Sequence, residues 1–423
     1  MDKRSTSGAL LPRLVCCVWL LSAVSLTAAV HCPTTMPYNC TCREEPFAVN
    51  CTNVALKTIP TNLPHAPSMT IANNKITSLT TIAYDNLVNL ILTNNEIKLV
   101  QDNVFQHLKS LTKLILSGNS IALLRPDMFS GLTSLTTLVL HGNPLYHLQS
   151  GIFSGSHMPM LSTLKLSQCS IYEISENAFD GLTKLQDLDL SHNHITSLTS
   201  ATGGKGLLSE LISLDASHNW IVDIGKDDFG GLSKLNTLVL SHNKIKTISS
   251  TVFNGLHNNL TALNLSYNRL TDISPAAFKY MPVLSALSLQ FNFLTTLDVN
   301  SIPWHGDEPV VHVHDNPWRC DCDLKWLFEK KSISAWNTNG TTKCAAPKNV
   351  EGEDLFQTEH SVFHHCYHSV SAAVVVTIVF FILLSVAVVG FIVYRRYCHG
   401  RLRSMRASGT DKEKVLSPPY RRV

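Results

Sequence analysis

Short stretches of the chain alternate leucine with polar residues and then reach an asparagine, as in LDLSHNHI at residues 188–195. The frame L-x-L-x-x-N-x-I/L recurs at intervals of 21, 24, 24, 26, 24, 26, 24, 25, 24 and 24 residues. Alternation over so few positions predicts a short strand, and the regular interval predicts a series of similar units. The asparagine position holds Asn74, Asn95, Asn119, Asn143, Cys169, Asn193, Asn219, Asn243, Asn268, Asn292 and Asn316.

An aromatic residue ten positions after most of these asparagines gives the same register independently. Gly203 and Ile302 interrupt this pattern, and the glycines near residue 203 indicate a loop. A single unit cannot bury its own leucines, so neighbouring units must stack, with a parallel sheet on one side and an aromatic column on the other. The aromatic residues are Tyr84, Phe105, Phe129, Phe153, Phe179, Phe229, Phe253 and Phe278.

The frame and its period resemble those of leucine-rich repeats. The resemblance predicts an α/β solenoid of the leucine-rich-repeat horseshoe type, with a parallel β-sheet on the concave face. The asparagine amide turns inward and satisfies backbone groups that would otherwise be buried without partners. We therefore interpret Asn193 and its equivalents as structural, and Cys169 as a small buried residue in the same position.

Eight cysteines lie in two groups of four, one before and one after the repeats. In an oxidising compartment such groups predict disulfide-bonded caps that cover the apolar ends of the solenoid. Zinc is the alternative for the C-x-C spacing, and four cysteines allow three connectivities. The two groups are Cys32, Cys40, Cys42 and Cys51, and Cys320, Cys322, Cys344 and Cys366.

The segments around these cysteines resemble the caps of extracellular leucine-rich-repeat proteins. They read CPTTMPYNCTCREEPFAVNC at residues 32–51 and HDNPWRCDCDLKWL at residues 314–327. The resemblance covers residues 32–366, and the layout is similar to that of single-pass adhesion and signalling members of the family. A tail of 29 residues leaves no room for a Toll-type signalling domain. The resemblance implies the disulfides Cys32–Cys42, Cys40–Cys51, Cys320–Cys344 and Cys322–Cys366.

Two apolar segments predict how the chain is placed in the cell. Basic residues before the first apolar run and small residues after it predict a secretory signal peptide. Residues 371–393 carry no charge over 23 positions and would span about 34 Å as a helix. Arginines follow directly, so we expect a single-pass type I plasma-membrane protein with an extracellular N-terminus. The expected segments are 1–29 (signal peptide), 30–64 (N-terminal cap), 65–313 (repeats), 314–366 (C-terminal cap), 370–394 (transmembrane helix) and 395–423 (cytoplasmic tail).

Side chains that alternate with the leucines should face solvent on the concave side of the sheet. The position between the two leucines is aliphatic from Ile91 to Val139 and charged from Lys165 to Asp215. Aliphatic side chains beside a charged cluster are typical of a protein-contact patch, although a polar face also serves solubility. The ligand-binding residues that we expect are Ile91, Ile115, Val139, Lys165, Asp187, Asp189 and Asp215.

The carboxylates of Asp187, Asp189 and Asp215 allow an enzymatic alternative, in which stacked like charges supply an acid beside a base. An open solenoid face offers no pocket that excludes water, so we expect no enzyme activity and no cofactor. The formal net charge of +3 is too small to indicate a nucleic-acid partner.

The tripeptide S-H-N recurs and places His192, His218 and His242 at equivalent positions. Such a column could sense pH or bind a metal ion. A solvated edge of the turn is the simpler interpretation, and we expect no metal site.

Five N-x-S/T sequons predict glycosylation. Asn264 lies in the concave column, so a glycan there would leave the part from Ile91 to Asp215 as the better binding surface. Cap cysteines occupy the middle of two sequons and would hinder transfer. The sequons begin at Asn39, Asn50, Asn259, Asn264 and Asn339.

The tail carries two short patterns. Cys398 lies among arginines next to the apolar segment, which favours palmitoylation. The motif YRRV, from Tyr420 to Val423, resembles a tyrosine-based sorting signal, which would make a clathrin adaptor a partner. A solvated tail is the alternative to both.

These patterns together predict a cell-surface protein that binds an extracellular or cell-surface protein ligand through its concave face. It would act in adhesion, or as a receptor or co-receptor that needs a membrane co-receptor to signal. The alternative is innate immune recognition of microbial surface molecules, which the repeats permit.

Overall fold

The computed structural model of the protein describes residues 32–408 except for residues 81, 83, 154, 203–207, 257, 303–308, 330–341, 357–362, 364–365 and 367–371. The expected signal peptide, the sequon at Asn339 and the sorting motif at Tyr420 and Val423 lie outside the described residues. The chain divides into two compact units, Met1–Phe356 and Gln357–Val423.

Each repeat contributes a three-residue strand to the main sheet, because its alternating stretch is short. The central leucine or methionine of the repeat strands is buried, and the residues on either side remain at least partly exposed. The strands of this sheet are β1 (Thr41–Arg43), β2 (Ala48–Asn50), β3 (Ser68–Thr70), β5 (Asn89–Ile91), β7 (Lys113–Ile115), β8 (Thr137–Val139), β10 (Thr163–Lys165), β12 (Asp187–Asp189), β13 (Ser213–Asp215), β14 (Thr237–Val239), β16 (Ala262–Asn264), β18 (Ala286–Ser288) and β19 (Val310–His312).

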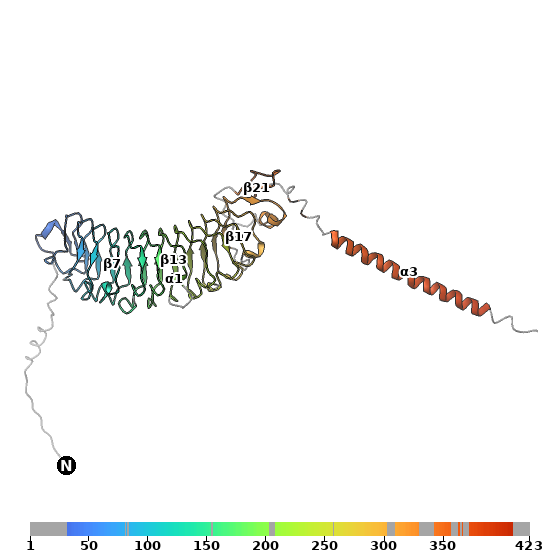
Figure 1. Ribbon diagram of the computed structural model, residues 1–423, viewed down its shortest axis with the longest axis horizontal. Coiled ribbons are helices and arrows are strands. Elements are labelled where there is room, and N and C mark those ends of the chain that lie inside the picture. The colour runs from blue at the N-terminus through green and yellow to red at the C-terminus, as the bar shows by residue number, and fades with distance from the viewer. Residues whose placement is uncertain are drawn as a thin grey trace, which may run out of the picture. The chain divides into compact units, whose positions relative to one another are not determined.

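Within the described part of the chain, the main sheet has 13 strands, which follow the order of the sequence from β1 to β19. The pair β1 and β2 is antiparallel, and β2 then pairs with β3 in parallel, as do the repeat strands with one another. The strands lie side by side along the first unit (Figure 1). Equivalent residues pair directly, as Leu164 does with Leu138 and Leu188. The predicted leucine-rich-repeat solenoid with a parallel sheet is therefore confirmed.

The asparagines of the frame connect successive repeats through backbone hydrogen bonds. Asn219 is buried, and its amide nitrogen donates to the carbonyl groups of Leu190, Ala216 and Ser217. Its carboxamide oxygen accepts from the backbone N–H of Ile195 in the preceding repeat, at 3.0 Å. Each such side chain satisfies polar groups of two repeats, so it specifies the spacing between them.

The opposite side of the solenoid contains the predicted aromatic column. The rings of Phe129, Phe153 and Phe179 follow one another at 6.1 and 5.8 Å, and a second run begins at Phe229. Between the runs, where the aromatic pattern is interrupted, the chain forms the short helix α1 (Thr199–Thr202). The other elements on the loops of the repeats are β4 (Ser78–Leu79), β6 (Leu99–Val100), η2 (Pro126–Phe129), β9 (His147–Leu148), β11 (Glu173–Ile174), β15 (Thr247–Ile248), β17 (Asp272–Ile273) and η3 (Val299–Ser301).

Disulfides stabilise both ends of the solenoid. Three of the pairs that the resemblance implies are present in the structure, and Cys322 and Cys366 are each disulfide-bonded as well. In the C-terminal cap, Trp318 is fully buried, and its indole nitrogen donates to the carbonyl oxygen of Val313 at 3.0 Å. The cap elements are η1 (Pro37–Asn39), β20 (Trp318–Arg319), η4 (Cys322–Leu324), α2 (Lys325–Glu329) and β21 (Cys344–Ala346). The three pairs are Cys32–Cys42, Cys40–Cys51 and Cys320–Cys344.

The second unit contains the helix α3 (Ala372–Ser408). Its segment Val376–His399 is long and apolar enough to cross a bilayer, with a mean hydropathy of 3.0. Within the described residues, this is the one candidate transmembrane helix. Cys398 lies near the end of this segment as a half-exposed free cysteine.

Candidate ligand-binding face

The structure places six of the seven sequence-predicted binding residues at equivalent positions of neighbouring strands, and it places Asp187 two residues before Asp189 on β12. Ile91 pairs with Ile115, and Ile115 pairs with Val139. The three side chains are half-buried rather than fully exposed. They therefore form a continuous aliphatic surface that a ligand can desolvate further at little additional cost. We call the last residues of the repeat strands β3 to β18 the concave column: Thr70, Ile91, Ile115, Val139, Lys165, Asp189, Asp215, Val239, Asn264 and Ser288.

Lys165 forms the boundary between the aliphatic and the charged part of the concave column. Its ammonium group lies 2.7 Å from the carboxylate of Asp187 on the neighbouring strand β12. Both side chains keep about a third of their surface exposed, at 32% and 36%. The pair therefore presents a fixed dipole to solvent, rather than two independent charges.

The two carboxylates of the concave column, those of Asp189 and Asp215, have local partners that the sequence analysis did not assign. The carboxylate of Asp189 accepts hydrogen bonds from the backbone N–H and the hydroxyl of Ser191, at 3.0 and 2.7 Å. Asp215 accepts from the backbone N–H of Ser217 at 2.9 Å. These side chains close the turn that follows each strand, which is a structural task that aspartate commonly performs. The recurring D-x-S spacing was the signal that could have revealed it.

The three histidines of the S-H-N tripeptides do form a column, and the column continues beyond them. The rings of His192, His218 and His242 stack at centroid distances of 4.0 Å. Tyr267 and Phe291 extend the stack at 4.1 and 4.2 Å. The sequence analysis missed these two members, although they occupy the same position of the frame. We call the five residues the aromatic ladder.

Burial lowers the pKa of His218, and the neighbouring imidazoles of His242 and His192 lower it further, while Asp215 opposes them. Burial likewise lowers the pKa of His242, with a contribution from His192. Rings stacked face to face direct their nitrogens sideways rather than towards one central ion. Among the described residues, no group of three or more His, Cys, Asp or Glu side chains is arranged to hold a metal ion.

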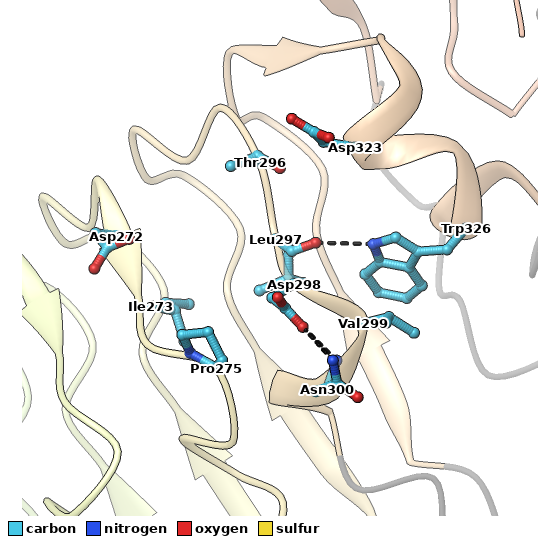
Figure 2. Close-up of a pocket in the computed structure, with 10 residues that line it drawn as sticks. All are labelled: Asp272, Ile273, Pro275, Thr296, Leu297, Asp298, Val299, Asn300, Asp323 and Trp326. Atoms are coloured by element: carbon cyan, nitrogen blue, oxygen red, sulfur yellow. Dashed lines mark hydrogen bonds between the residues drawn. The ribbon is translucent and has the colours of Figure 1, made fainter. Parts of the chain in front are cut away.

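A pocket of about 390 Å³ lies where the last repeats meet the C-terminal cap (Figure 2). The side chain of Trp326 lines one wall of the pocket, and its indole nitrogen donates to the carbonyl oxygen of Leu297 at 2.8 Å. Asp298 lies beside it, and its carboxylate accepts from the backbone N–H and the amide of Asn300. No pattern in the sequence indicated this pocket, because its cap side, formed by Asp323 and Trp326, lies outside the repeat.

The described sequons differ in their surroundings. The side chain of Asn264 lies in the concave column and accepts from the backbone N–H and hydroxyl of Ser266. Asn259 is exposed, and its amide donates to the carbonyl oxygen of Ser233. Asn39 and Asn50 are exposed beside Cys40 and Cys51, which are bonded to each other. Glycosylation of all four stays a prediction.

Known proteins match the repeats. The family model described as leucine rich repeat covers residues 85–145, 133–195, 209–258 and 258–302. Immunoglobulin superfamily member 10 of Homo sapiens is 31% identical over 88 residues, which are 18% of this chain and 3% of that protein. The same protein of Rattus norvegicus is 36% identical over 88 residues, with the same coverage. The chain thus matches a small part of these relatives.

Solved structures share the solenoid. A chain of the mouse RP105/MD-1 complex has a TM-score of 0.61 at 21% identity, over 74% of this chain and 53% of that one. A chain of the octameric complex of Latrophilin 3, Unc5D and FLRT2 (LRR) has a TM-score of 0.55 at 20% identity, over 77% and 98%. Human 5T4, trophoblast glycoprotein, reaches 0.48 at 22% identity, over 79% and 99%.

At these identities the likeness to solved structures concerns the fold, while the family match concerns the repeats themselves. The repeat register, the disulfides at both ends and the apolar helix α3 agree with that match. The described part of the chain therefore contains leucine-rich repeats, disulfide-bonded caps and one candidate transmembrane helix.

Proposed function

We propose that this protein is a membrane-anchored cell-surface protein that binds a protein ligand through the concave column between Ile91 and Asp215. The observation that carries the proposal is the direct pairing of Ile91, Ile115 and Val139 beside the ion pair of Lys165. An aliphatic strip bordered by charged groups matches the core and rim of a protein interface.

Disulfide-bonded caps support an extracellular position for the repeats, because disulfides persist in oxidising compartments. With α3 as the membrane span, the arginines that follow it favour a type I orientation with the N-terminus outside. Two of the similar solved structures are complexes with protein partners, one of RP105 with MD-1 and one of FLRT2 with Latrophilin 3 and Unc5D. These complexes support our proposal that the ligand of this chain is also a protein.

The test uses the full-length chain on the surface of cells, probed with a library of tagged secreted and cell-surface proteins and, in parallel, with a microbial glycan array. We expect saturable binding of a protein that weakens about tenfold or more in Ile115→Glu and Lys165→Glu. Lys184→Glu, an exposed charge reversal away from the concave column, is the matched control. Binding that ignores the column substitutions would contradict the proposed surface.

Glycan binding without any protein partner would instead favour recognition of microbial surface molecules. To distinguish a role in adhesion from a role as a receptor, the protein is clustered on the cell surface and intracellular phosphorylation is measured. A response that disappears when residues 399–423 are deleted indicates a receptor or co-receptor, and the absence of a response indicates adhesion. Palmitoylation of Cys398 and recognition of Tyr420 and Val423 by a clathrin adaptor belong to the same proposal for the tail.

A further inference from the structure

A second row of exposed and half-exposed side chains runs beside the aromatic ladder, one position after each frame asparagine. In this row the ring of His194 lies 4.5 Å from the ring of Trp220, and the ammonium group of Lys244 lies 4.5 Å above Trp220 on its other side. The row continues through exposed Arg269 and Phe293. We call it the outer row, and the ladder and the outer row together the ridge.

The ridge exposes large apolar side chains to solvent. Trp220, Tyr267 and Phe293 have 46%, 42% and 57% of their surface exposed, and Phe291 has 37%. Clusters of exposed aromatic side chains are uncommon on soluble surfaces and are typical of interfaces, where tryptophan, tyrosine and arginine dominate the binding energy. The exposure is therefore informative, because these rings are not needed to fill the core.

The backbone conformation of the ladder residues is one that few side chains adopt. All five ladder residues have positive φ angles, between 52° and 55°. Glycine adopts this conformation freely, and asparagine and histidine adopt it more often than most residues, whereas tyrosine and phenylalanine rarely do. Four of the five preceding repeats follow that preference, with Asn73, Asn94, Gly118 and Gly142 at the equivalent position, whereas the fifth has Gln168. Tyr267 and Phe291 therefore carry a conformational cost, and such costs concentrate at functional sites.

The charge of the ridge is of one sign. Lys244 and Arg269 are the charged side chains of the ridge, and its members from His192 to Phe293 include no aspartate or glutamate. The acidic residues at equivalent positions of other repeats are Glu96, in an early repeat, and Asp315, next to the cap, whose carboxylate lies 2.6 Å from the imidazole of His314. The nearby Asp189 and Asp215 belong to the concave column, where each accepts hydrogen bonds from a serine two residues later. An acidic partner would meet cations and ring edges, whose partial charge is positive.

We propose that the ridge binds an acidic segment of a second protein, whose carboxylates contact Lys244 and Arg269 and whose apolar side chains pack on Trp220 and Phe293. This surface is distinct from the concave column, and its use does not depend on the ligand proposed for that column. A protein fits better than a sulfated glycan, because the ridge offers few cations and much exposed aromatic surface.

In the test, peptides that bind the full-length chain in detergent micelles are selected from a random library. We expect peptides enriched in Asp and Glu next to Trp, Phe or Leu, with binding that weakens as salt is added. Trp220→Ala and Lys244→Glu should each weaken binding about tenfold or more. Tyr146→Ala, with 49% exposure outside the ridge, and Lys75→Glu, at the outer-row position of an early repeat, are the matched controls.

Three outcomes overturn the proposal. The first is a selection that yields no acidic preference. The second is loss of peptide binding in Lys165→Glu but not in Trp220→Ala, which would place the peptide on the concave column. The third combines two results: the selection yields no peptide, and heparin, tested in a separate assay, binds the unchanged protein but not Lys244→Glu. This would indicate that the ridge binds a sulfated glycan. Unchanged thermal unfolding of the ridge variants shows that they fold, and Lys244→Gln provides a milder variant.

Discussion

The carboxamide oxygen of Asn193 accepts hydrogen bonds from the backbone N–H groups of Cys169 and Ile171, both at 2.9 Å. Its amide nitrogen donates to carbonyl groups of its own repeat and of the preceding one. Asn193 is 3% exposed, so water cannot replace these bonds. One side chain therefore satisfies polar backbone groups of two repeats at once.

The substitution Asn193→Ala should therefore destabilise the protein strongly. Two buried N–H groups would lose their acceptor, and each unsatisfied group costs about 1–3 kcal/mol. We expect the free energy of unfolding to fall by about 3 kcal/mol in a urea titration followed by circular dichroism. The exposed Asn254→Ala is the control and should change it by less than about 0.5 kcal/mol. Equal effects of the two substitutions would show that the hydrogen bonds of the Asn193 carboxamide do not contribute to stability.

Cys169 occupies the asparagine position without an amide, and the structure adapts around it. The backbone N–H of Leu145, whose equivalents elsewhere bond to an asparagine side chain, donates instead to the carbonyl oxygens of Asn143 and Cys169. Burial raises the pKa of the Cys169 thiol to about 11. Because the thiolate is the reactive species, the native protein should resist N-ethylmaleimide at this residue.

The measurement is mass spectrometry of the peptide that contains Cys169 after timed labelling at neutral pH. We expect labelling only after urea is added, and the unfolded sample is the control for reactivity. Rapid modification of the native chain would contradict the buried position of the thiol.

The stack of His192, His218 and His242 should make stability depend on pH. The pKa of His218 and His242 is lowered from the ordinary value of 6.5, first by burial. The folded state then binds fewer protons than the unfolded state, so this contribution is present above pH 6.5 and is lost as the pH falls through the lowered pKa. Acidification should therefore shift the urea midpoint to lower concentration.

The variant His218→Asn tests the assignment, because asparagine tolerates a positive φ and does not titrate. Its urea midpoint should depend less on pH between about 7 and about 5 than that of the unchanged protein. The exposed His107→Asn is the matched control and should retain the full dependence. An identical slope in all three proteins would place the titrating group elsewhere.

The repeat made the register predictable, because a constant period places equivalent residues on neighbouring strands. Leu188 therefore had to lie beside Leu164 and Leu214, and the column from Ile91 to Asp215 followed from the same frame. Backbone conformation was not visible in the period. The positive φ of Tyr267 and the stack that it extends became apparent only in the structure.

Contacts between segments that do not repeat were equally hidden from the sequence. Trp326 reaches Leu297 across the junction of the last repeat and the cap, and no periodic position relates the two. The buried Asp228 is another example, since it accepts from the hydroxyl of Thr199 and the backbone N–H of Gly225. It links α1 to the next repeat at the place where the aromatic column is interrupted.

A close backbone approach at Gly155 predicts a large effect of a small substitution. The methyl group of an alanine there would lie 1.9 Å from the carbonyl oxygen of Gly181. Because both partners are backbone, the repeats would have to separate, and overpacking of this kind costs about 1–3 kcal/mol. Gly151→Ala is the control, since it has a positive φ but no atom within 4 Å. Thermal unfolding should show the larger decrease in Gly155→Ala, and a larger decrease in Gly151→Ala would contradict the close approach.

The ion pair between Lys165 and Asp187 should contribute little to stability, although its atoms are 2.7 Å apart. Both side chains are about one third exposed, and pairs of this kind contribute about 0–1 kcal/mol because water and salt screen them. We expect a double-mutant cycle of Lys165→Met and Asp187→Asn to give a coupling free energy below about 1 kcal/mol in urea titrations. Coupling well above that value would mean that the pair maintains the fold, and loss of binding in Lys165→Glu would then report unfolding. A small coupling leaves the substituted sheet intact, so that the same loss would report direct contact between Lys165 and the ligand.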